Sequence, residues 1–122
     1  MDDRGSDRVL VCRAGEERFA VPVSMVREVV VLPALTRIPS APPAVRGLAN
    51  VRGRLVTVLG GMSRNGFPAA GTGESLVVLR SRQGQLGLAV DEVEEVASAA
   101  DTRVGLVDVE ALVRGVMEGL PR

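Results

Sequence analysis

The sequence is divided into short apolar runs by Gly, Pro and charged residues, and this division limits the chain to a fold made mainly of strands. Each run has four to six residues and is rich in Val and Leu, which is typical of strands. An ordinary helix requires a longer periodic segment. The predicted strands are Val9–Arg13, Arg18–Val23, Arg46–Val51, Leu55–Leu59, Leu76–Leu79, Leu86–Val90 and Arg103–Val107.

The breaks between these runs predict turns and one long loop. Gly15-Glu16-Glu17 and residues 81–84 are polar and contain Gly, which is typical of hairpin turns. Residues 60–74 contain five Gly and show no apolar periodicity. We therefore expect residues 60–74 to form an exposed mobile loop.

Two segments interrupt the strand pattern and predict helices. Ser24 stands where a helix N-cap would lie, and apolar residues after it fall on one helical face, which predicts a short helix near 24–31. Near the end of the sequence, apolar residues recur at i, i+3, i+4 and i+7 after Asp108. Because the Asp108 side chain can cap the first turn, we expect a second helix near 108–117.

Length and composition predict one small domain with its own core. The 122 residues are 46% hydrophobic, and a chain of this size buries roughly two-thirds of its unfolded surface. We expect a flexible N-terminus over 1–8, a single domain over 9–118 and a tail over 119–122. The first residues are polar and unlike a signal peptide, and no apolar run reaches the ~18 residues of a membrane span. These features predict a cytoplasmic protein.

The charge balance gives no indication of a nucleic-acid or membrane partner. Fifteen Arg residues are cancelled by fifteen Asp and Glu residues, so no net positive charge attracts phosphates or anionic lipids. Phe19 and Phe67 are the only aromatic residues, and Phe19 lies in an apolar run where we expect it to be core. Surfaces that bind single-stranded nucleic acid rely on several aromatic stacking platforms. We therefore expect neither nucleic-acid binding nor membrane insertion.

The residue inventory also argues against catalysis. The sequence has no His and a single Cys12, which excludes a zinc site and any His-based triad. Neighbouring carboxylates such as Asp91 and Glu92 would point to opposite faces of a strand, so they cannot converge on one bond. We therefore predict a protein that is not an enzyme and has no metal or cofactor. Cys12 is interpreted as a buried structural thiol and Asp91 as a structural residue of its own loop.

The segment from Pro39 to Gly60 predicts a rigid hairpin that presents polar residues. Its prolines fix their own φ and favour extended geometry in the residues before them. Gly53 can adopt the positive φ that a tight turn requires, which places Asn50 and Arg52 near the hairpin tip. A polar pair held in this way is suited to recognition.

The same hairpin resembles the Asn-Leu-Arg-Gly hairpin of the CheW family, adaptors that couple bacterial chemoreceptors to their histidine kinase. Val9–Val23 is similar to the first two strands of the family, and Met25–Val30 to its "V-x-E-V" helix. Leu86–Val93 is similar to the "G-x-x-V-D-x-V" strand, and Leu106–Leu112 to the closing strand and helix. These motifs follow one another in the family's order over residues 9–117.

This resemblance implies a mostly β fold of two small SH3-like barrels, with a receptor's helical tip docked in the groove between them. The implied partners are the signalling tip of a chemoreceptor (methyl-accepting protein) and a CheA-type histidine kinase or another CheW-like protein. An apolar patch would accept a helix face, and a charged pair would orient it through charge-assisted hydrogen bonds. The candidate receptor-binding residues are Val23, Val26, Glu28, Gly47, Asn50 and Arg52.

Each candidate also has a purely structural interpretation. Val26 is equally compatible with a core position, and Asn50 with a local side-chain hydrogen bond that only stabilises its turn. Glu28 is also compatible with an ion pair to neighbours of Arg27 on an exposed face. Arg52 is compatible with a solvated surface position, although a turn would accept many other residues there.

The chain also departs from the family pattern. Gly60-Gly61 replaces the family's Asp-Leu pair, and the interval from Val93 to Leu106 is much shorter than in the family. We therefore expect the second barrel to be reduced by at least one strand. A missing strand leaves backbone groups unpaired unless the C-terminal helix, a second copy of the chain or another partner covers the edge. Homodimerisation through an exposed strand edge is thus left open.

These features predict a non-catalytic adaptor that is recruited to receptor arrays, binds a chemoreceptor tip and couples weakly or indirectly to the kinase. One alternative is a conventional coupler that bridges receptor and kinase. A further alternative is a small-ligand-binding β-barrel, for which the sequence offers no ordered polar pocket.

Overall fold

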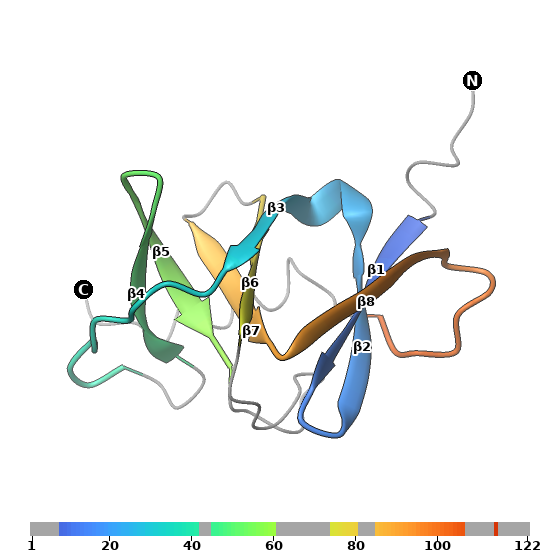
Figure 1. Ribbon diagram of the computed structural model, residues 1–122, viewed down its shortest axis with the longest axis horizontal. Coiled ribbons are helices and arrows are strands. Elements are labelled where there is room, and N and C mark those ends of the chain that lie inside the picture. Colours follow the sequence, from blue (N-terminus) through green and yellow to red (C-terminus); the bar gives the residue numbers. More distant parts are fainter. Residues whose placement is uncertain (1–7, 42–44, 61–73, 81–84, 107–113, 115–122) are drawn as a thin grey trace.

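The structure is a computed structural model that describes residues 8–41, 45–60, 74–80, 85–106 and 114. In this part of the chain, eight strands and one 3-10 turn form two sheets (Figure 1). The mostly β prediction is confirmed. The elements are β1 (Arg8–Ala14), β2 (Glu17–Pro22), η1 (Val23–Met25), β3 (Val26–Val31), β4 (Val45–Val51), β5 (Arg54–Leu59), β6 (Ser75–Leu79), β7 (Leu86–Val90) and β8 (Glu92–Ser98).

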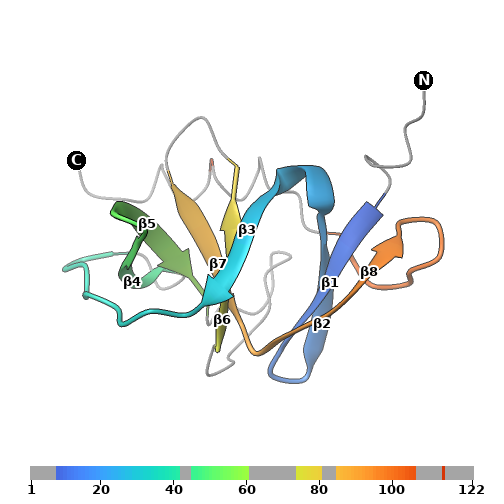
Figure 2. The same ribbon diagram turned by 45° about the horizontal axis from the view of Figure 1, so that its top comes forward.

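The two sheets differ in size and pack against each other in the middle of the molecule. The larger sheet has the order β3-β6-β7-β5-β4, in which only β5 and β7 are parallel. The smaller sheet has the order β2-β1-β8 and is entirely antiparallel. In Figures 1 and 2, the β4–β5 hairpin lies on one side, the smaller sheet on the other, and β6 and β7 between them.

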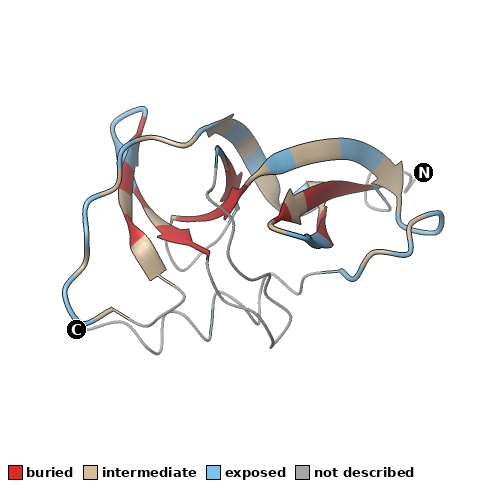
Figure 3. Cartoon of the chain, turned by 60° about the horizontal axis from the view of Figure 1, so that its bottom comes forward, coloured by how far each residue is buried: buried red, intermediate tan, exposed pale blue. Residues whose placement is uncertain are grey.

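The main core lies between the two sheets and includes the central strands of the larger one. Because side chains alternate across a strand, one set from β6 and β7 faces the smaller sheet while the other set faces away from it. Both strands are therefore buried on two faces, as the red segments of Figure 3 show. The buried residues of this core are Leu10, Cys12, Ala14, Phe19, Val21, Leu59, Val77, Leu79, Leu86, Leu88 and Val90.

A second core lies on the other side of the larger sheet, where the sheet curls round itself. It contains small side chains such as Ala49 and Ala89 beside Val and Leu. A Cβ atom added at Gly87 would lie 2.6 Å from Cδ1 of Leu76. The space inside the curl is therefore narrow, and a side chain at position 87 would require Leu76 to shift.

The larger sheet is closed into a small barrel by the segment that follows β3. Thr36 and Leu48 exchange two backbone hydrogen bonds of 2.8 and 2.7 Å, and this pairing joins the β3 side of the sheet to its opposite edge at β4. Gly47 makes the approach possible, because a Cβ atom there would lie only 2.6 Å from the Thr36 carbonyl oxygen. Its φ of +149° also favours glycine.

The smaller sheet is extended at one of its two edges. It has three strands, and its β2 edge is extended by a single parallel bridge between Ala20 and Leu106. In this bridge the Ala20 amide donates to the Gly105 carbonyl at 2.8 Å. Strand β8 occupies the other edge, and β1 lies between β2 and β8.

The predicted helix near 24–31 is wrong. Only Val23–Met25 form a 3-10 turn, so Ser24 lies inside the turn and not at its N-cap. Val26–Val31 form β3, which pairs with β6 and alternates between half-buried and exposed residues. The run of β-branched Val residues satisfies this period of two better than a helical period, and pairing with a buried strand decides the outcome.

Other boundary predictions have mixed outcomes. Six of the seven predicted strands are present within two residues of their expected ends, but among the described residues of the seventh, 103–106, only Leu106 forms a bridge. Strand β8 was not predicted. The turn at Gly15 is confirmed, and Phe19 is core. The predicted turn at 81–84, the loop at 61–73, the N-terminus at 1–7 and the tail at 119–122 lie outside the described residues. So does most of the helix near 108–117, of which Arg114 is described and helical.

Replacement of Gly47 by Ala is expected to open the barrel closure. The added Cβ atom would overlap the Thr36 backbone and would be held at an unfavourable φ, so we expect a loss of about 3 kcal/mol in unfolding free energy. Urea denaturation followed by circular dichroism measures this loss. Gly105→Ala is the matched control, because a Cβ atom there meets nothing within 4 Å. Equal stability of the two variants would contradict the proposed role of Gly47.

Alkaline pH is expected to destabilise the protein through Cys12. Burial raises the pKa of this thiol from 9.0 to about 12, and the nearby Glu94 carboxylate adds to the rise. The unfolded chain therefore loses the proton first, so stability is intact below pH 9 and falls by about 1.4 kcal/mol per pH unit up to pH 12.

The sequence makes this measurement unusually clean. It contains no Lys, His or Tyr, and Arg stays protonated, so Cys12 is the only side chain expected to titrate in this window. Denaturation midpoints at pH 8, 9.5 and 11 should fall for the unaltered protein and stay level for Cys12→Ala. A parallel decline in both proteins would show that another group is responsible.

Candidate protein-binding site

The β4–β5 hairpin ends in a two-residue turn that holds Arg52 and Gly53. Val51 pairs with Arg54 across the base of the turn, and the φ angles of Arg52 and Gly53 are 55° and 86°. Two successive positive φ values are typical of the type I′ turn, whose twist matches that of the flanking strands. The prediction that Gly53 forms the turn is confirmed, but the positive φ of Arg52 was not anticipated.

Asn50 stabilises this turn from within. Its Oδ1 accepts a hydrogen bond of 2.8 Å from the Gly53 amide. The local interpretation of Asn50 is therefore what the structure shows. Because this bond fixes the turn, it also restricts the backbone of Arg52, which precedes Gly53.

Arg52 reaches from the hairpin tip to the other edge of the larger sheet. Its Nε donates to Oε1 of Glu28 in β3 at 3.0 Å. The Arg52 side chain is 75% exposed and the Glu28 side chain 27%. Since β3 and β4 are the two edge strands, this ion pair spans the seam of the barrel on its surface.

The other candidate residues have mainly structural positions. Val26 is half-buried and packs against the main core, which supports its structural interpretation. Val23 is half-buried in the 3-10 turn, and its carbonyl accepts a hydrogen bond from the Val26 amide. Gly47 lies against Thr36 at the barrel closure. The structure thus joins Glu28 to Arg52 and gives Asn50 and Gly47 roles in shaping the hairpin.

Sequence reasoning missed three exposed apolar side chains close to these residues in the sequence. Val29 and Val31 of β3 expose 43% and 82% of their surface, and Leu55 of β5 exposes 63%. A period of two over Val26–Val31 would have indicated that every second Val faces solvent. Exposed large apolar residues are suited to contact with another protein.

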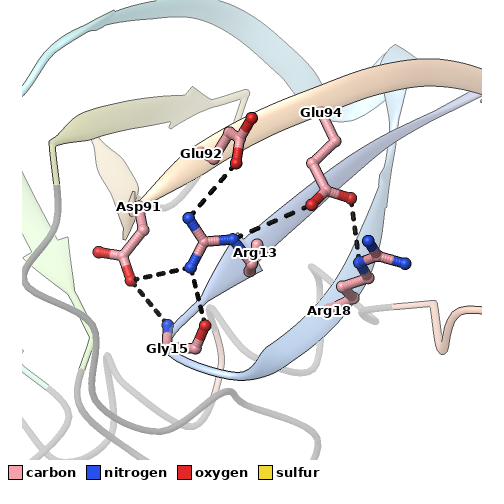
Figure 4. Close-up of polar contacts among 6 residues, drawn as sticks. All are labelled: Arg13, Gly15, Arg18, Asp91, Glu92 and Glu94. Carbon is pink, nitrogen blue, oxygen red and sulfur yellow. Dashed lines mark hydrogen bonds and ion pairs between the residues drawn. The ribbon is translucent and has the colours of Figure 1, made fainter.

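A second polar cluster lies at the turn between β7 and β8, where three carboxylates meet Arg13 (Figure 4). The guanidinium lies 3.7 Å from Asp91, 3.3 Å from Glu92 and 4.0 Å from Glu94. Arg18 of β2 adds a contact of 3.1 Å to Glu94. The cluster therefore ties β1, β2 and the start of β8 together.

Two backbone irregularities bring these carboxylates to one place. Asp91 lies in a bend before β8, where its Oδ2 accepts a 2.7 Å hydrogen bond from the Gly15 amide. Glu94 is the extra residue of a bulge, between Val93 and Glu95, which pair with consecutive residues of β1. The expectation that neighbouring carboxylates diverge applies to a regular strand, which this segment is not. The structural role predicted for Asp91 agrees with its contact to Gly15.

In the part of the chain that the structure describes, no group of three or more His, Cys, Asp or Glu side chains is arranged to hold a metal ion. Within that same part, no helix is long and apolar enough to cross a membrane. The ion pairs of the Arg13 cluster join β1, β2 and the start of β8, and the Glu28–Arg52 pair is an exposed ion pair whose carboxylate lies on β3.

The comparison with known protein families agrees with the two-sheet fold and the hairpin. The CheW-like domain family matches residues 8–120, which include every described strand. The chain belongs to the CheW-like domain family. The resemblance inferred from the motifs is therefore confirmed.

Individual CheW proteins match this CheW-like chain at lower identity. The chemotaxis protein CheW of Rhizobium meliloti (strain 1021) is 28% identical over 99 residues, covering 80% of this chain and 64% of the relative. A probable chemotaxis protein CheW of Rhizobium etli (strain ATCC 51251 / DSM 11541 / JCM 21823 / NBRC 15573 / CFN 42) is 27% identical over 101 residues, covering 81% and 65%. This chain thus spans slightly less than two-thirds of the length of these relatives.

A solved CheW structure supports the same fold. The scaffolding protein TtCheW from Thermoanaerobacter tengcongensis superposes with a TM-score of 0.65 and 27% identity, covering 76% of this chain and 62% of that protein. CheW-like proteins are non-catalytic scaffolds and adaptors, which agrees with the prediction that this chain is not an enzyme.

The Glu28–Arg52 pair of this CheW-like domain is expected to contribute little to stability. Because Arg52 is mostly exposed, a double-mutant cycle of Arg52→Ala and Glu28→Gln should give a coupling energy of about 0.5–1 kcal/mol. Urea denaturation of the four proteins measures it. The same cycle with Arg54→Ala, a neighbouring exposed Arg, should give no coupling. A coupling above about 2 kcal/mol would mean that the pair is a main structural element.

Proposed function

We propose that this chain is a non-catalytic, cytoplasmic adaptor of a bacterial chemotaxis-like signalling system, which binds the cytoplasmic tip of a chemoreceptor at receptor arrays. The observation that carries the proposal is the Glu28–Arg52 pair, which joins an ordered turn to β3, the strand that also exposes Val29 and Val31. Family membership supports the signalling context, and the hairpin supplies the contact.

The chemistry of this surface suits a helical partner. Apolar side chains on β3 offer area for the apolar face of an amphipathic helix. Arg52 and Glu28 offer a cation and an anion that can orient polar groups on the same helix through charge-assisted hydrogen bonds. The type I′ turn and the Asn50 bond reduce the conformational entropy that binding would otherwise cost.

We further propose that coupling to a CheA-type kinase is weak or indirect, through another CheW-like protein. The smaller sheet has three described strands, and the chain passes from the end of β8 at Ser98 to the bridge at Leu106 within eight residues. The resemblance implies that kinase contacts use both barrels. A reduced sheet should therefore weaken the kinase contact. It should have less effect on the hairpin, which lies at the opposite side of the molecule.

Binding to a soluble fragment that contains a chemoreceptor signalling tip tests the proposal. We expect saturable binding that Arg52→Ala weakens at least tenfold, since a charge-assisted contact of roughly 1.4 kcal/mol or more would be lost. Arg54→Ala, which removes an exposed Arg from the same hairpin, should leave the affinity within about twofold. Isothermal titration of the three proteins measures the difference.

A parallel titration with the regulatory domain of a CheA-type kinase separates the remaining functions. Receptor binding without measurable kinase binding supports the reduced adaptor. Strong binding to both partners would replace it with a conventional coupler, and binding to neither would reject the adaptor function.

A further inference from the structure

Strand β8 is a sheet edge that pairs on one side only in the described part of the chain. In the larger sheet, Leu48 of β4 pairs with Thr36 in the segment after β3, while β3 itself pairs only with β6 among the described residues. The β2 edge of the smaller sheet carries the bridge to Leu106. At β8, pairing is found only with β1, so the second side of the strand is open among the described residues.

The open edge is regular in its C-terminal half only. The bulge at Glu94 interrupts the first half, where Arg13 and Arg18 engage Glu92 and Glu94. From Glu95 to Ser98 the register with β1 is unbroken. This half exposes Glu95 and 47% of Val96, and β8 contains no buried residue (Figure 3). Alternate residues of this half direct their backbone amide and carbonyl groups away from β1, where an added strand can form hydrogen bonds with them.

Charge identifies the kind of segment that fits this edge. Glu95 is exposed and takes part in no ion pair with a described residue, unlike Glu92 and Glu94. A symmetric pairing of the whole of β8 with a second copy would place Glu95 opposite Glu95, and like charges directly opposite destabilise a sheet. An extended segment that carries Arg at this position would instead pair with the carboxylate.

We propose that the Glu95–Ser98 edge of β8 is a docking site for an extended, Arg-containing segment of a partner protein, which adds a fourth strand to the smaller sheet. Backbone hydrogen bonds supply most of the affinity, and Glu95 selects the charge. Val96 lies on the opposite face and favours an apolar residue next to the Arg. This site is separate from the Glu28–Arg52 pair and does not depend on the receptor proposal.

A labelled seven-residue peptide of alternating Arg and Val tests the site. Fluorescence anisotropy should show binding to the full chain, and amide hydrogen exchange should show new protection at those amides of Glu95–Ser98 that point away from β1. The same peptide with N-methylated backbone amides should not bind, and a Glu-Val peptide should bind far more weakly. Glu95→Gln should weaken binding of the Arg-Val peptide about fivefold, the effect of an exposed ion pair. Glu16→Gln, which removes an exposed carboxylate in the β1–β2 turn, should leave it unchanged.

Four results would overturn the proposal. They are no binding at millimolar peptide, equal binding of the N-methylated peptide, protection in the free monomer of those Glu95–Ser98 amides that point away from β1, and protection of these amides that rises with protein concentration alongside dimers in sedimentation. The third result would assign the edge to another part of the same chain, and the fourth to a second copy. The receptor titration uses a different surface, so either proposal can fail alone.

Discussion

The pairing of Thr36 with Leu48 is the constraint on which the larger barrel depends. It brings the segment after β3 against β4, at the opposite edge of the sheet, and it is possible only because Gly47 has no side chain. Once the edges meet, the hairpin tip lies within reach of β3, and Arg52 can contact Glu28. The Glu28–Arg52 pair thus depends on the backbone closure of the barrel. The ion pair does not make this closure, and it only orients the two side chains across it.

The second constraint is the two-sided burial of β6 and β7. One set of their side chains packs against Leu10, Cys12 and other residues of the smaller sheet, and the other set fills the barrel. Neither sheet can move relative to the other without exposing this shared apolar core. A surface on the hairpin and a surface on β8 therefore belong to one rigid framework, although they lie at opposite sides of it.

A feature of the fold or of the site could be predicted from the sequence when the interaction that determines it is local. Strands whose two faces are buried, such as Leu86–Val90, were visible as apolar runs, and Gly53 identified the hairpin turn. The β3 segment was misread as a helix, although its Val residues favour a strand, because the pairing with β6 that decides the outcome involves residues far away in the sequence. The Arg52–Glu28 contact joins residues 24 positions apart across a closed sheet, so no local pattern contains it. The bulge at Glu94 likewise depends on pairing with β1 and redirects carboxylates that a regular strand would separate.

The two arginine sites differ in a way that bears on function. Arg13 is held by three carboxylates and by the Gly15 carbonyl at 2.8 Å, so releasing it would break several contacts at once. Arg52 is held by a single contact and is mostly exposed, and such a pair contributes about 1 kcal/mol or less. A partner that supplies its own carboxylate can therefore replace Glu28 at little cost, whereas the same exchange at Arg13 would loosen the junction of three strands. The proposed recognition function is thus assigned to Arg52, because its partner Glu28 is more easily exchanged than the partners of Arg13.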